Sequence, residues 1–564
     1  MADKTGRFAI IEQFIADGIQ YMFGNPGTVE QGFLDALGKY DNFEYILAMQ
    51  ETIAVAMADG YARTTKKPTV VQLHSGVGLG NGIGMLYQAY RGHAPLVVVT
   101  SEAGIVYDAM DSQMAADLVG MAKPVTKWAT RVVHPTSLLR ILRRAIRTAG
   151  TPPMGPVFVC LPADILDAPV QEEIVPTSIP STRVVPDPNL IDQAVSMLNG
   201  AKKPIIIMGD GIAYSGAQDE LTRVAELWGA DVWGADSSEV NMSTTHPLYK
   251  GSLGHMFGAN SSKVITQADA ILICGTYVFP EVYPYLSGMF APGARIVHID
   301  LNAYEIAKNF PVDLGLVSDP KLTLEQLAIA LETAMTSESK MAAKDRMSAS
   351  GKSRERELAA QLEADRAARD DIPLRASRFM EELAQHVPDD LIIFDEALTS
   401  SPPITRYMPP TMPGHFFQTR GGSLGVGIPG ALGLKLAHPD KTVIGFTGDG
   451  GSMYTIQALW TAARHNIGAK FIICNNQSYM LLKLNIKQYW REQGVNDGVF
   501  PDSFDLGKPM VDFVKMSESL GVPGVRVEKQ DQVGPAVEQM LKHDGPFLID
   551  MVVTNELPDP SSGK

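Results

Sequence analysis

Two short polar segments near the carboxyl end of the chain have the residue types that bind phosphate and a divalent metal. The first, Gly448-Asp449-Gly450-Gly451, follows the apolar strand pattern VIGFT and precedes the helical pattern IQALWTAARH. Free backbone amides at a helix N-terminus bind phosphate oxygens, and an aspartate beside them can hold magnesium, which prefers oxygen ligands. Such a glycine-rich turn taken alone is commonly only a turn.

The second segment, Asn475-Asn476, ends the next apolar strand pattern, FIIC. One helix and one strand fill the interval after Asp449, and a parallel crossover brings both strand ends to the same edge of the sheet. Asp449 and Asn476 are therefore predicted to point at one ion. Far away in the sequence, Glu51 lies between the strand pattern EYILAMQ and the helical pattern TIAVAMADGYAR. It is either an ordinary helix-start carboxylate favoured by the dipole or a group presented into a crevice.

The elements around these residues predict an α/β fold. Amphipathic helical patterns alternate with apolar runs such as TVVQL, PLVVVT, PIIIMGDG and AKFIICNN, the rhythm of a mostly parallel sheet flanked by helices. We predict three such domains, at residues 1–175, 186–335 and 372–555, with a charged helical linker at 336–371. The first and third could share a fold.

Composition excludes several classes of protein. A chain of 564 residues is too long for one core, and its net charge of −15 disfavours nucleic-acid and anionic-membrane partners. No apolar run approaches the ~20 residues that span a bilayer, and the N-terminus lacks the pattern of a signal peptide, so we expect a cytoplasmic protein. Cys160, Cys274 and Cys474 lie in or at the end of apolar strand patterns and are expected to be reduced core residues.

The GDG and NN segments, together with QETIAVAMADGYAR, resemble the signature of thiamine-diphosphate-dependent enzymes. Over essentially the whole chain the resemblance is closest to benzoylformate decarboxylase and related 2-oxo acid decarboxylases, and it extends to acetolactate-synthase-like enzymes. It rests further on FGNPGT, LHSGVGLGN and ALWTAARHNI. The resemblance implies a pyrimidine-binding first domain, a middle domain that shapes the substrate entrance, and a diphosphate-binding third domain.

The resemblance also assigns roles to residues. It implies that Asp449, Asn476 and the main-chain carbonyl of Ser478 bind Mg2+. It implies that Glu51 exchanges a proton with the aminopyrimidine ring, that His74 and Thr28 face the substrate, and that Leu424 props the folded cofactor. Leu424 is equally an ordinary core residue, as are Met480, Leu481 and Leu482, which follow the metal motif. The remaining residues implied to bind thiamine diphosphate are Asn81, Thr399, Gly448, Gly450, Gly451 and Ser452, with Glu51 and Ser478 again among them.

The implied reaction is thiamine-diphosphate- and magnesium-dependent decarboxylation of a 2-oxo acid through a ylide and an enamine. One departure leaves alternatives open. Where benzoylformate decarboxylase has a second active-site histidine, this chain reads TYVFPEVYPYL, with Val282 at the matching position. Without that acid the enamine can instead be joined to a second aldehyde or ketone, as in a carboligase, and a lyase acting on a 2-hydroxy carbonyl compound is a further alternative. Glu281, Tyr283 and Tyr285 are candidate replacements or ordinary surface-loop residues.

The resemblance further implies assembly. In this family the two domains that share one cofactor come from different subunits, so we expect at least a homodimer and, more specifically, a homotetramer. A non-catalytic sensor or scaffold that kept the fold is disfavoured, because Glu51, Asp449 and Asn476 are all present.

Overall fold

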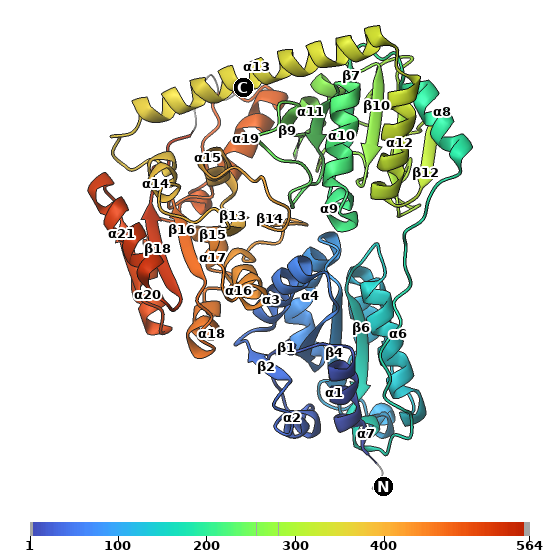
Figure 1. Cartoon of the computed structure of the whole chain (residues 1–564). Helices are drawn as coiled ribbons and strands as arrows, with labels where there is room; N and C mark the ends of the chain where they lie inside the picture. Colours follow the sequence, from blue (N-terminus) through green and yellow to red (C-terminus); the bar gives the residue numbers. More distant parts are fainter. Residues whose placement is uncertain (1–3, 255, 280, 558–564) are drawn as a thin grey trace.

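The computed structural model describes residues 4–254, 256–279 and 281–557 (Figure 1). These residues form three sheets, each with six parallel strands and flanking helices, so the predicted fold class is confirmed. In Figure 1 the first unit is blue to cyan, the middle unit is mostly green, and the third runs from yellow to red. The limits predicted for the domains stay a prediction, because the sheets alone do not fix where one domain ends.

The first unit has the strand order β2-β1-β3-β4-β6-β5. Its strands are β1 (Tyr21–Gly24), β2 (Glu44–Leu47), β3 (Thr69–His74), β4 (Leu96–Glu102), β5 (Trp128–Arg131) and β6 (Val157–Pro162). Its helices are α1 (Gly6–Ala16), α2 (Gln31–Leu37), α3 (Glu51–Thr65), α4 (Ser75–Arg91), α5 (Leu118–Ala122), α6 (Leu138–Gly150) and α7 (Ala163–Asp167). The central strand β4, LVVVTSE, is buried over its first six residues, as expected for a parallel strand covered on both faces.

The middle unit has the order β12-β11-β10-β7-β8-β9. Its strands are β7 (Pro204–Met208), β8 (Asp231–Gly234), β9 (Tyr249–Ser252), β10 (Ala270–Cys274), β11 (Arg295–Asp300) and β12 (Leu314–Val317). Its helices are α8 (Pro188–Leu198), α9 (Gly211–Ser215), α10 (Gln218–Trp228), α11 (Gly258–Ile265) and α12 (Pro320–Ala334). The order reverses between β7 and β10, where open α/β sheets bind ligands beyond the carboxyl ends of their strands.

The long helix α13 (Ser337–Ala367) runs along one side of the molecule from the middle unit to the third (Figure 1). The third unit has the order β14-β13-β15-β16-β18-β17. Its strands are β13 (Ile392–Glu396), β14 (Phe416–Gln418), β15 (Val443–Gly448), β16 (Lys470–Asn475), β17 (Gly524–Val527) and β18 (Phe547–Val552). Its helices are α14 (Ala376–Leu383), α15 (Ser401–Tyr407), α16 (Gly427–Ala437), α17 (Asp449–Ser452), α18 (Ala458–Arg464), α19 (Met480–Gln493), α20 (Phe513–Ser519) and α21 (Gln530–Lys542).

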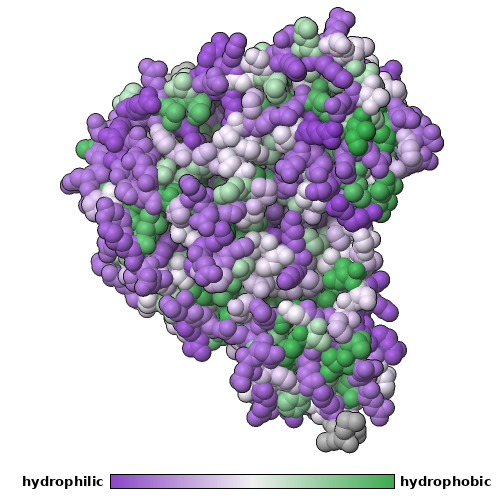
Figure 2. Space-filling model, viewed as in Figure 1, coloured by the Kyte–Doolittle hydropathy of each residue, from purple (hydrophilic) through white to green (hydrophobic). Residues whose placement is uncertain are grey.

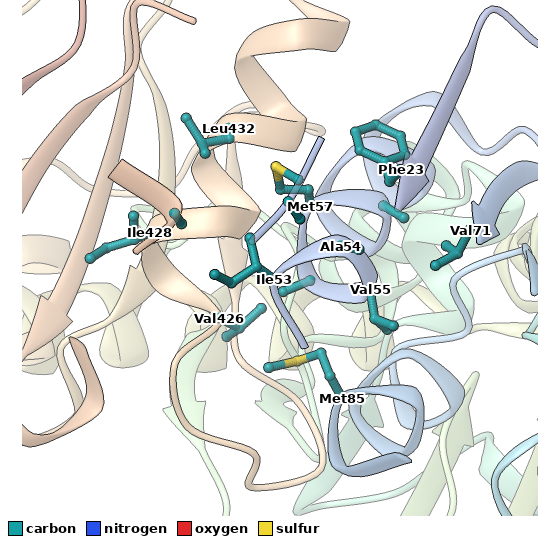
Figure 3. Close-up of a cluster of buried hydrophobic side chains, with 14 of the residues drawn as sticks. Phe23, Ile53, Ala54, Val55, Met57, Val71, Met85, Val426, Ile428 and Leu432 are labelled. Carbon is teal, nitrogen blue, oxygen red and sulfur yellow. The ribbon is translucent and has the colours of Figure 1, made fainter. Parts of the chain in front are cut away.

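Helices α3 and α16 join the first and third units through glycines. A Cβ atom at Gly60 would lie 2.2 Å from the carbonyl oxygen of Gly430, and one at Gly433 would lie 2.0 Å from that of Met57. Glycine is therefore required at both positions for the helix backbones to touch. Around this contact Ile53 and other side chains of α3 meet the apolar side chains of α16 in one buried cluster (Figure 3).

A buried arginine ties all three units together. Arg63, on α3, donates to the carbonyl oxygen of Gln418 in the third unit at 2.9 Å and to Oγ of Ser238 in the middle unit at 2.9 Å. Its guanidinium also lies 3.6 Å from Glu239 and 3.9 Å from Asp59. Paired and hydrogen-bonded in this way, the buried charge fixes the relative placement of the units.

The surface and core fit the composition. The face shown in Figure 2 is mainly hydrophilic, with hydrophobic patches between the polar side chains. Among the helices in the described ranges, none combines the length and the apolar character that a membrane crossing requires. The three cysteines are buried in β6, β10 and β16 and form no disulfide, as predicted.

Candidate active site

Glu51 begins α3 after the end of β2, and its side chain is held by two amides. Its residue is only 5% exposed. Asn25, which follows β1, donates through Nδ2 to Oε1 at 3.2 Å, and Asn81 on α4 donates to Oε2 at 3.0 Å. A Cβ atom at Gly78 would lie 2.8 Å from Oε1, so the glycine leaves room for the carboxyl group. The sequence predicted Glu51 and Asn81 but missed Asn25.

His74 ends β3 and is paired with a buried carboxyl group. Its Nδ1 lies 2.8 Å from Oε2 of Glu30, a residue that is 1% exposed and whose Oε1 has no hydrogen-bond partner among the described residues. Burial raises the pKa of Glu30, and the hydrogen bond from His74 opposes that rise. A proton on Nδ1 satisfies Glu30 and leaves Nε2 as the ring nitrogen that can meet a ligand.

The loop beside this pair explains a glycine of the FGNPGT segment. A Cβ atom at Gly27 would lie 1.9 Å from Nδ1 of His74, so the backbone packs directly against the imidazole ring. Thr28 follows and is exposed. The His74 side chain keeps 17% of its area exposed. The structure therefore brings the loop after β1 and the end of β3 together at the edge where α3 begins.

Asp449 begins α17 directly after β15, and one of its oxygens lacks a partner. Oδ1 accepts the backbone N–H of Gly450 at 2.8 Å, whereas Oδ2 is buried and has no hydrogen-bond partner among the described residues. Burial raises the pKa of Asp449 to about 6, against backbone N–H groups of Gly450, Gln477 and Ser478 that lower it. A buried carboxylate oxygen without a partner is costly, and a cation is the group that would satisfy it.

Asn476 and Ser478 lie beside Asp449 because β15 and β16 are neighbours, with Gly448 opposite Cys474. Oδ1 of Asn476 accepts the backbone N–H of Ser478 at 3.0 Å, and both residues are buried. The carbonyl oxygen of Ser478 accepts the N–H of Met480 at 2.8 Å and keeps a second lone pair.

The described residues hold no cluster of three or more His, Cys, Asp or Glu suited to a metal. A metal here would therefore depend on one carboxylate together with amide and carbonyl oxygens, the hard donor set that suits Mg2+.

The glycines of the turn after β15 allow other groups to lie close to its backbone. A Cβ atom at Gly450 would lie 2.6 Å from the Tyr479 ring, whereas one at Gly448 would meet nothing within 4 Å. The hydroxyl of Ser452 is fully buried and donates to the carbonyl oxygen of Asp449 at 2.8 Å. Ser452 thus stabilises the turn itself, while the backbone at Gly448 faces open space.

A second buried carboxyl group, at Glu396, holds the loop that carries Leu424. Glu396 ends β13 and accepts the backbone N–H groups of Gly425 and, at 2.6 Å, Gly427. Burial raises its pKa to about 7. Leu424 is half-buried at the start of this loop, and Thr399, in the short helix Leu398–Ser400 after β13, is also half-buried. The sequence predicted Leu424 and Thr399 but missed Glu396.

Two clusters therefore exist within one chain. The hydrogen bonds of Glu51 all lie in the first unit and those of Asp449 in the third. Among the described residues, no hydrogen bond or ion pair joins these two carboxylates. The backbone N–H groups of Gln477 and Ser478 lie near Asp449, whereas Glu51 lies in a separate cluster. The roles predicted for these residues stay a prediction.

The middle unit adds a cavity of about 740 Å³ at the carboxyl ends of its strands. Asp210 follows β7, Gly275 follows β10 and Asp300 ends β11, so the cavity lies at the reversal of strand order. Arg91 of the first unit and Arg420 of the third also line it.

The sequence suggested replacements for a missing histidine in the segment around Val282. Val282 is 55% exposed there, and Tyr283 and Tyr285 are also largely exposed. Glu281 is instead buried and accepts a hydrogen bond from Ser261, so it is not a surface-loop residue.

Comparison with protein families gives three matches. Residues 4–121 match the thiamine pyrophosphate enzyme N-terminal TPP-binding domain, residues 191–327 the central domain, and residues 399–551 the C-terminal TPP-binding domain. Among curated proteins, the benzoylformate decarboxylase of Pseudomonas aeruginosa is 30% identical, with 97% of this chain and 98% of that protein covered. A probable acetolactate synthase large subunit of Methanococcus aeolicus is 28% identical, with 99% and 92% covered.

Solved structures agree. The crystal structure of benzoylformate decarboxylase from Polynucleobacter necessarius superposes with a TM-score of 0.84 at 26% identity and covers 98% of this chain and 99% of its own. A thiamine diphosphate-dependent 4-hydroxybenzoylformate decarboxylase of Rhodococcus jostii gives a TM-score of 0.83 at 28% identity, with the same coverage.

Proposed function

The chain belongs to the thiamine pyrophosphate enzyme family, and from this premise we propose that it decarboxylates a 2-oxo acid with thiamine diphosphate and Mg2+. Membership makes it a thiamine-diphosphate-dependent enzyme of the decarboxylase and acetolactate synthase group. The observation that carries the proposal is the pair of carboxylates at the sheet edges of the first and third units. Glu51 is held by two amides, and Oδ2 of Asp449 is buried without a hydrogen-bond partner among the described residues.

The residues present fit the cofactor and its metal. Oδ2 of Asp449, Oδ1 of Asn476 and the carbonyl oxygen of Ser478 would bind Mg2+. The open backbone at Gly448 and the turn Gly450–Ser452 would receive the diphosphate, with Thr399 and Leu424 flanking the ring system. When bound, thiamine diphosphate supplies a carbanion that adds to a 2-oxo group and accepts the electrons released as carbon dioxide leaves.

Glu51 is proposed to hold and transfer a proton at its carboxyl group. Because Asn25 and Asn81 each donate to one of its oxygens, the carboxyl group has a fixed orientation while a further lone pair of each oxygen stays available. Proton transfer of this kind needs the group within hydrogen-bond reach of its partner. Asn81 therefore supports the cofactor through Glu51.

His74 is proposed to orient the substrate carboxylate and to move a proton through Nε2. Its Nδ1 is held by Glu30, which fixes the ring plane and the tautomer. Thr28, exposed next to the glycine that packs on the ring, would donate a hydrogen bond to the same substrate. Glu30 acts through His74 and is a positioning residue.

Carboligation is the second candidate function. The acetolactate synthase relatives align over nearly the whole chain, and the exposed Val282 supplies no proton to the product of decarboxylation. With Glu281 buried on Ser261, Val282 and Leu286 are the exposed apolar side chains of this segment, and they would contact a second carbonyl compound. A lyase acting on a 2-hydroxy carbonyl compound would use the same residues.

The deciding experiment measures carbon dioxide release from aromatic and aliphatic 2-oxo acids with thiamine diphosphate and Mg2+, with and without an aldehyde, followed by product identification. Free aldehyde as the product supports the decarboxylase, and hydroxyketone alone supports the carboligase. The protein without added Mg2+ is the control for the metal. Cofactor binding with no carbon dioxide release from any acid would overturn the 2-oxo acid assignment and favour the lyase.

The separation of the two clusters also supports assembly. Because no hydrogen bond or ion pair joins Glu51 to Asp449 among the described residues, we propose that each cofactor lies between Glu51 of one subunit and Asp449 of another, in at least a homodimer and more specifically a homotetramer. Light scattering gives the subunit number directly. Mixing a Glu51→Gln variant with an Asp449→Asn variant, each inactive, should restore part of the activity, because mixed oligomers contain one intact site.

A further inference from the structure

A second cavity, of about 550 Å³, lies at the edge of the middle sheet opposite the cavity of the strand carboxyl ends. It is lined by the amino ends of β7, β8 and β9, by the end of α11 with the turn after it, and by one side of α13. We name it the lysine pocket after the residues at its rim, which are Lys202, Lys203, Lys250, Lys263 and Arg346.

The charge of this pocket is opposite to that of the chain. Five cationic side chains and one acid, Asp231, line it, whereas the whole protein carries a net charge of −15. Among the described residues, none of the four lysines has an ion-pair partner. Like charges gathered around one cavity repel each other, and a bound anion removes that repulsion.

The acids close to the rim are already engaged by other groups. The carboxylate of Asp231 accepts the hydroxyl of Ser350 at 2.7 Å. The carboxylate of Asp269, just outside the pocket, accepts the backbone N–H groups of Lys202 and Lys203 at 2.8 and 2.9 Å. Among the described residues, neither acid forms an ion pair with a rim lysine, although the charge of Asp269 acts on Arg346 and opposes the lowering of its pKa by burial.

The floor of the pocket is apolar. Ile205, Trp233, Val264 and Ala268 line it, and the half-buried Trp233 packs on the buried cluster that contains Ile205. A bare inorganic anion gains nothing from such a floor, whereas a flat organic ring buries apolar area on it and can stack on the indole.

We propose that the lysine pocket binds an organic polyphosphate, with an aromatic ring on the Trp233 floor and its phosphates among the rim cations. A nucleoside triphosphate has this chemistry. Arg346 is the most constrained rim cation, since its guanidinium donates to the carbonyl oxygens of Trp228 and, at 3.1 Å, Gly229. It presents its remaining N–H groups from a fixed position.

Ligand binding at this pocket would stabilise the docking of α13. Arg346 and Ser350 on α13 both bond to the middle unit, and Arg406 of the third unit pairs with Asp365 near the other end of the same helix. A polyphosphate held between α13 and the strand ends therefore joins the middle sheet to the element that leads into the third unit.

The test uses the enzyme loaded with thiamine diphosphate and Mg2+ and then freed of unbound cofactor. The proposed cofactor site then does not take up the probe, and thiamine diphosphate, which itself has aromatic rings and phosphates, does not compete for the lysine pocket. Isothermal titration calorimetry compares ATP, tripolyphosphate and adenosine. ATP is expected to bind most tightly, with an affinity that falls as salt rises, and adenosine least. Equal affinities for ATP and tripolyphosphate would overturn the proposed role of the floor, and no binding of ATP at millimolar concentration would overturn the site.

Two triple variants locate the binding. Lys202→Glu with Lys250→Glu and Lys263→Glu should weaken ATP binding by about 10- to 100-fold, since three favourable charge pairs become repulsive. Lys39→Glu with Lys67→Glu and Lys123→Glu changes the net charge equally at exposed lysines of the first unit and should leave binding unchanged. ATP affinity that is unchanged in the pocket variant, or reduced equally in both, would place binding elsewhere and overturn the proposal.

A third variant tests the floor separately. Trp233→Leu keeps an apolar residue but removes the indole, so it should weaken ATP binding several-fold while leaving tripolyphosphate binding unchanged. Circular dichroism and the decarboxylation assay check that each variant remains folded and active. Equal loss of both ligands would show that the indole does not contact a ring.

Discussion

The first and third units have the same strand order, β2-β1-β3-β4-β6-β5 in one and β14-β13-β15-β16-β18-β17 in the other. Corresponding strands β3 and β15 each end at the residue that caps a helix, His74 in the first unit and Gly448 in the third. Corresponding strands β1 and β13 are followed or ended by polar residues that bond across the sheet edge, Asn25 and Glu396. Equivalent backbone positions thus carry different functional groups.

The two sheet edges differ in whether both oxygens of the carboxylate have hydrogen-bond partners within the chain. At the edge of the first unit both oxygens of Glu51 accept hydrogen bonds from amides. At the edge of the third, Oδ2 of Asp449 is buried without a partner among the described residues. The shared topology therefore supplies the position, whereas the side chains decide whether a carboxylate is satisfied by amides of its own unit or requires a cation.

The largest effect on turnover is expected for Glu51, at the edge of the first sheet. Glu51→Gln keeps the size of the side chain but removes the acid, so turnover should fall by about 10²- to 10⁴-fold, the range of general acid–base catalysis. Steady-state decarboxylation with saturating cofactor measures it. Glu338→Gln, at the first turn of α13, is the matched control because it is also a helix-start carboxylate and is exposed. Full turnover by Glu51→Gln would remove Glu51 from the mechanism.

At the edge of the third unit, replacing the carboxylate of Asp449 by an amide should raise the stability of the protein but weaken cofactor binding. Asp449→Asn replaces a buried negative charge by a neutral amide, so the protein without cofactor should become more stable by about 1–3 kcal/mol. Metal-dependent binding of thiamine diphosphate should weaken by more than about 100-fold, because a direct ligand matters more than a residue that supports one. Calorimetry with and without Mg2+ measures the loss. Asp440→Asn, at an exposed position before β15, is the control. A destabilised Asp449→Asn protein would show that the buried carboxylate of Asp449 does not cost stability.

Glu396 makes the third unit dependent on pH. Because burial raises the pKa of its carboxyl group from 4.5 to about 7, the folded state holds this proton more tightly than the unfolded chain. Its contribution to the free energy of unfolding is therefore complete below the unfolded pKa and is lost as the pH rises through about 7. The loss amounts to about 3 kcal/mol.

Glu396→Gln tests this directly. The variant cannot accept both backbone N–H groups, so its free energy of unfolding should be lower than that of the wild type at about pH 4, and this difference should shrink by about 3 kcal/mol at about pH 8. Urea unfolding of the cofactor-free protein at the two pH values measures the difference. Glu528→Gln, which is exposed, should show no such change. A difference that is constant with pH would mean that Glu396 does not titrate in this range.

Sequence patterns predicted what depends on neighbours along the chain. Strand ends are marked by apolar runs that stop at polar residues, so Glu51, His74, Asp449 and Asn476 could be placed at sheet edges, and their crossover put Asp449 and Asn476 together. The three parallel sheets followed from the same alternation, and the resemblance supplied the roles.

Residues that act across the fold were missed. Asn25 reaches Glu51, Glu30 reaches His74 and Glu396 reaches the loop at Gly425, and each contact joins segments that are separate in the sequence. An acidic residue in a loop is expected to be exposed to solvent unless the packing around it is known, so the burial of Glu30 could not be predicted. The hydroxyl of Ser452 likewise turned out to bond within its own turn.

The smallest effect is expected for Glu30, whose Oε1 is a buried carboxyl oxygen of the first unit that has no hydrogen-bond partner among the described residues. If Glu30 serves to hold His74, Glu30→Gln should keep most of the activity, because its amide oxygen still accepts from Nδ1, whereas Glu30→Leu should lower kcat/KM by about tenfold, or about 1.4 kcal/mol. A double-mutant cycle decides the point: in a His74→Ala background, Glu30→Leu should cause no further loss. A full additional loss in that background would show that Glu30 acts on the ligand itself, as Asp449 is proposed to do, rather than through the histidine.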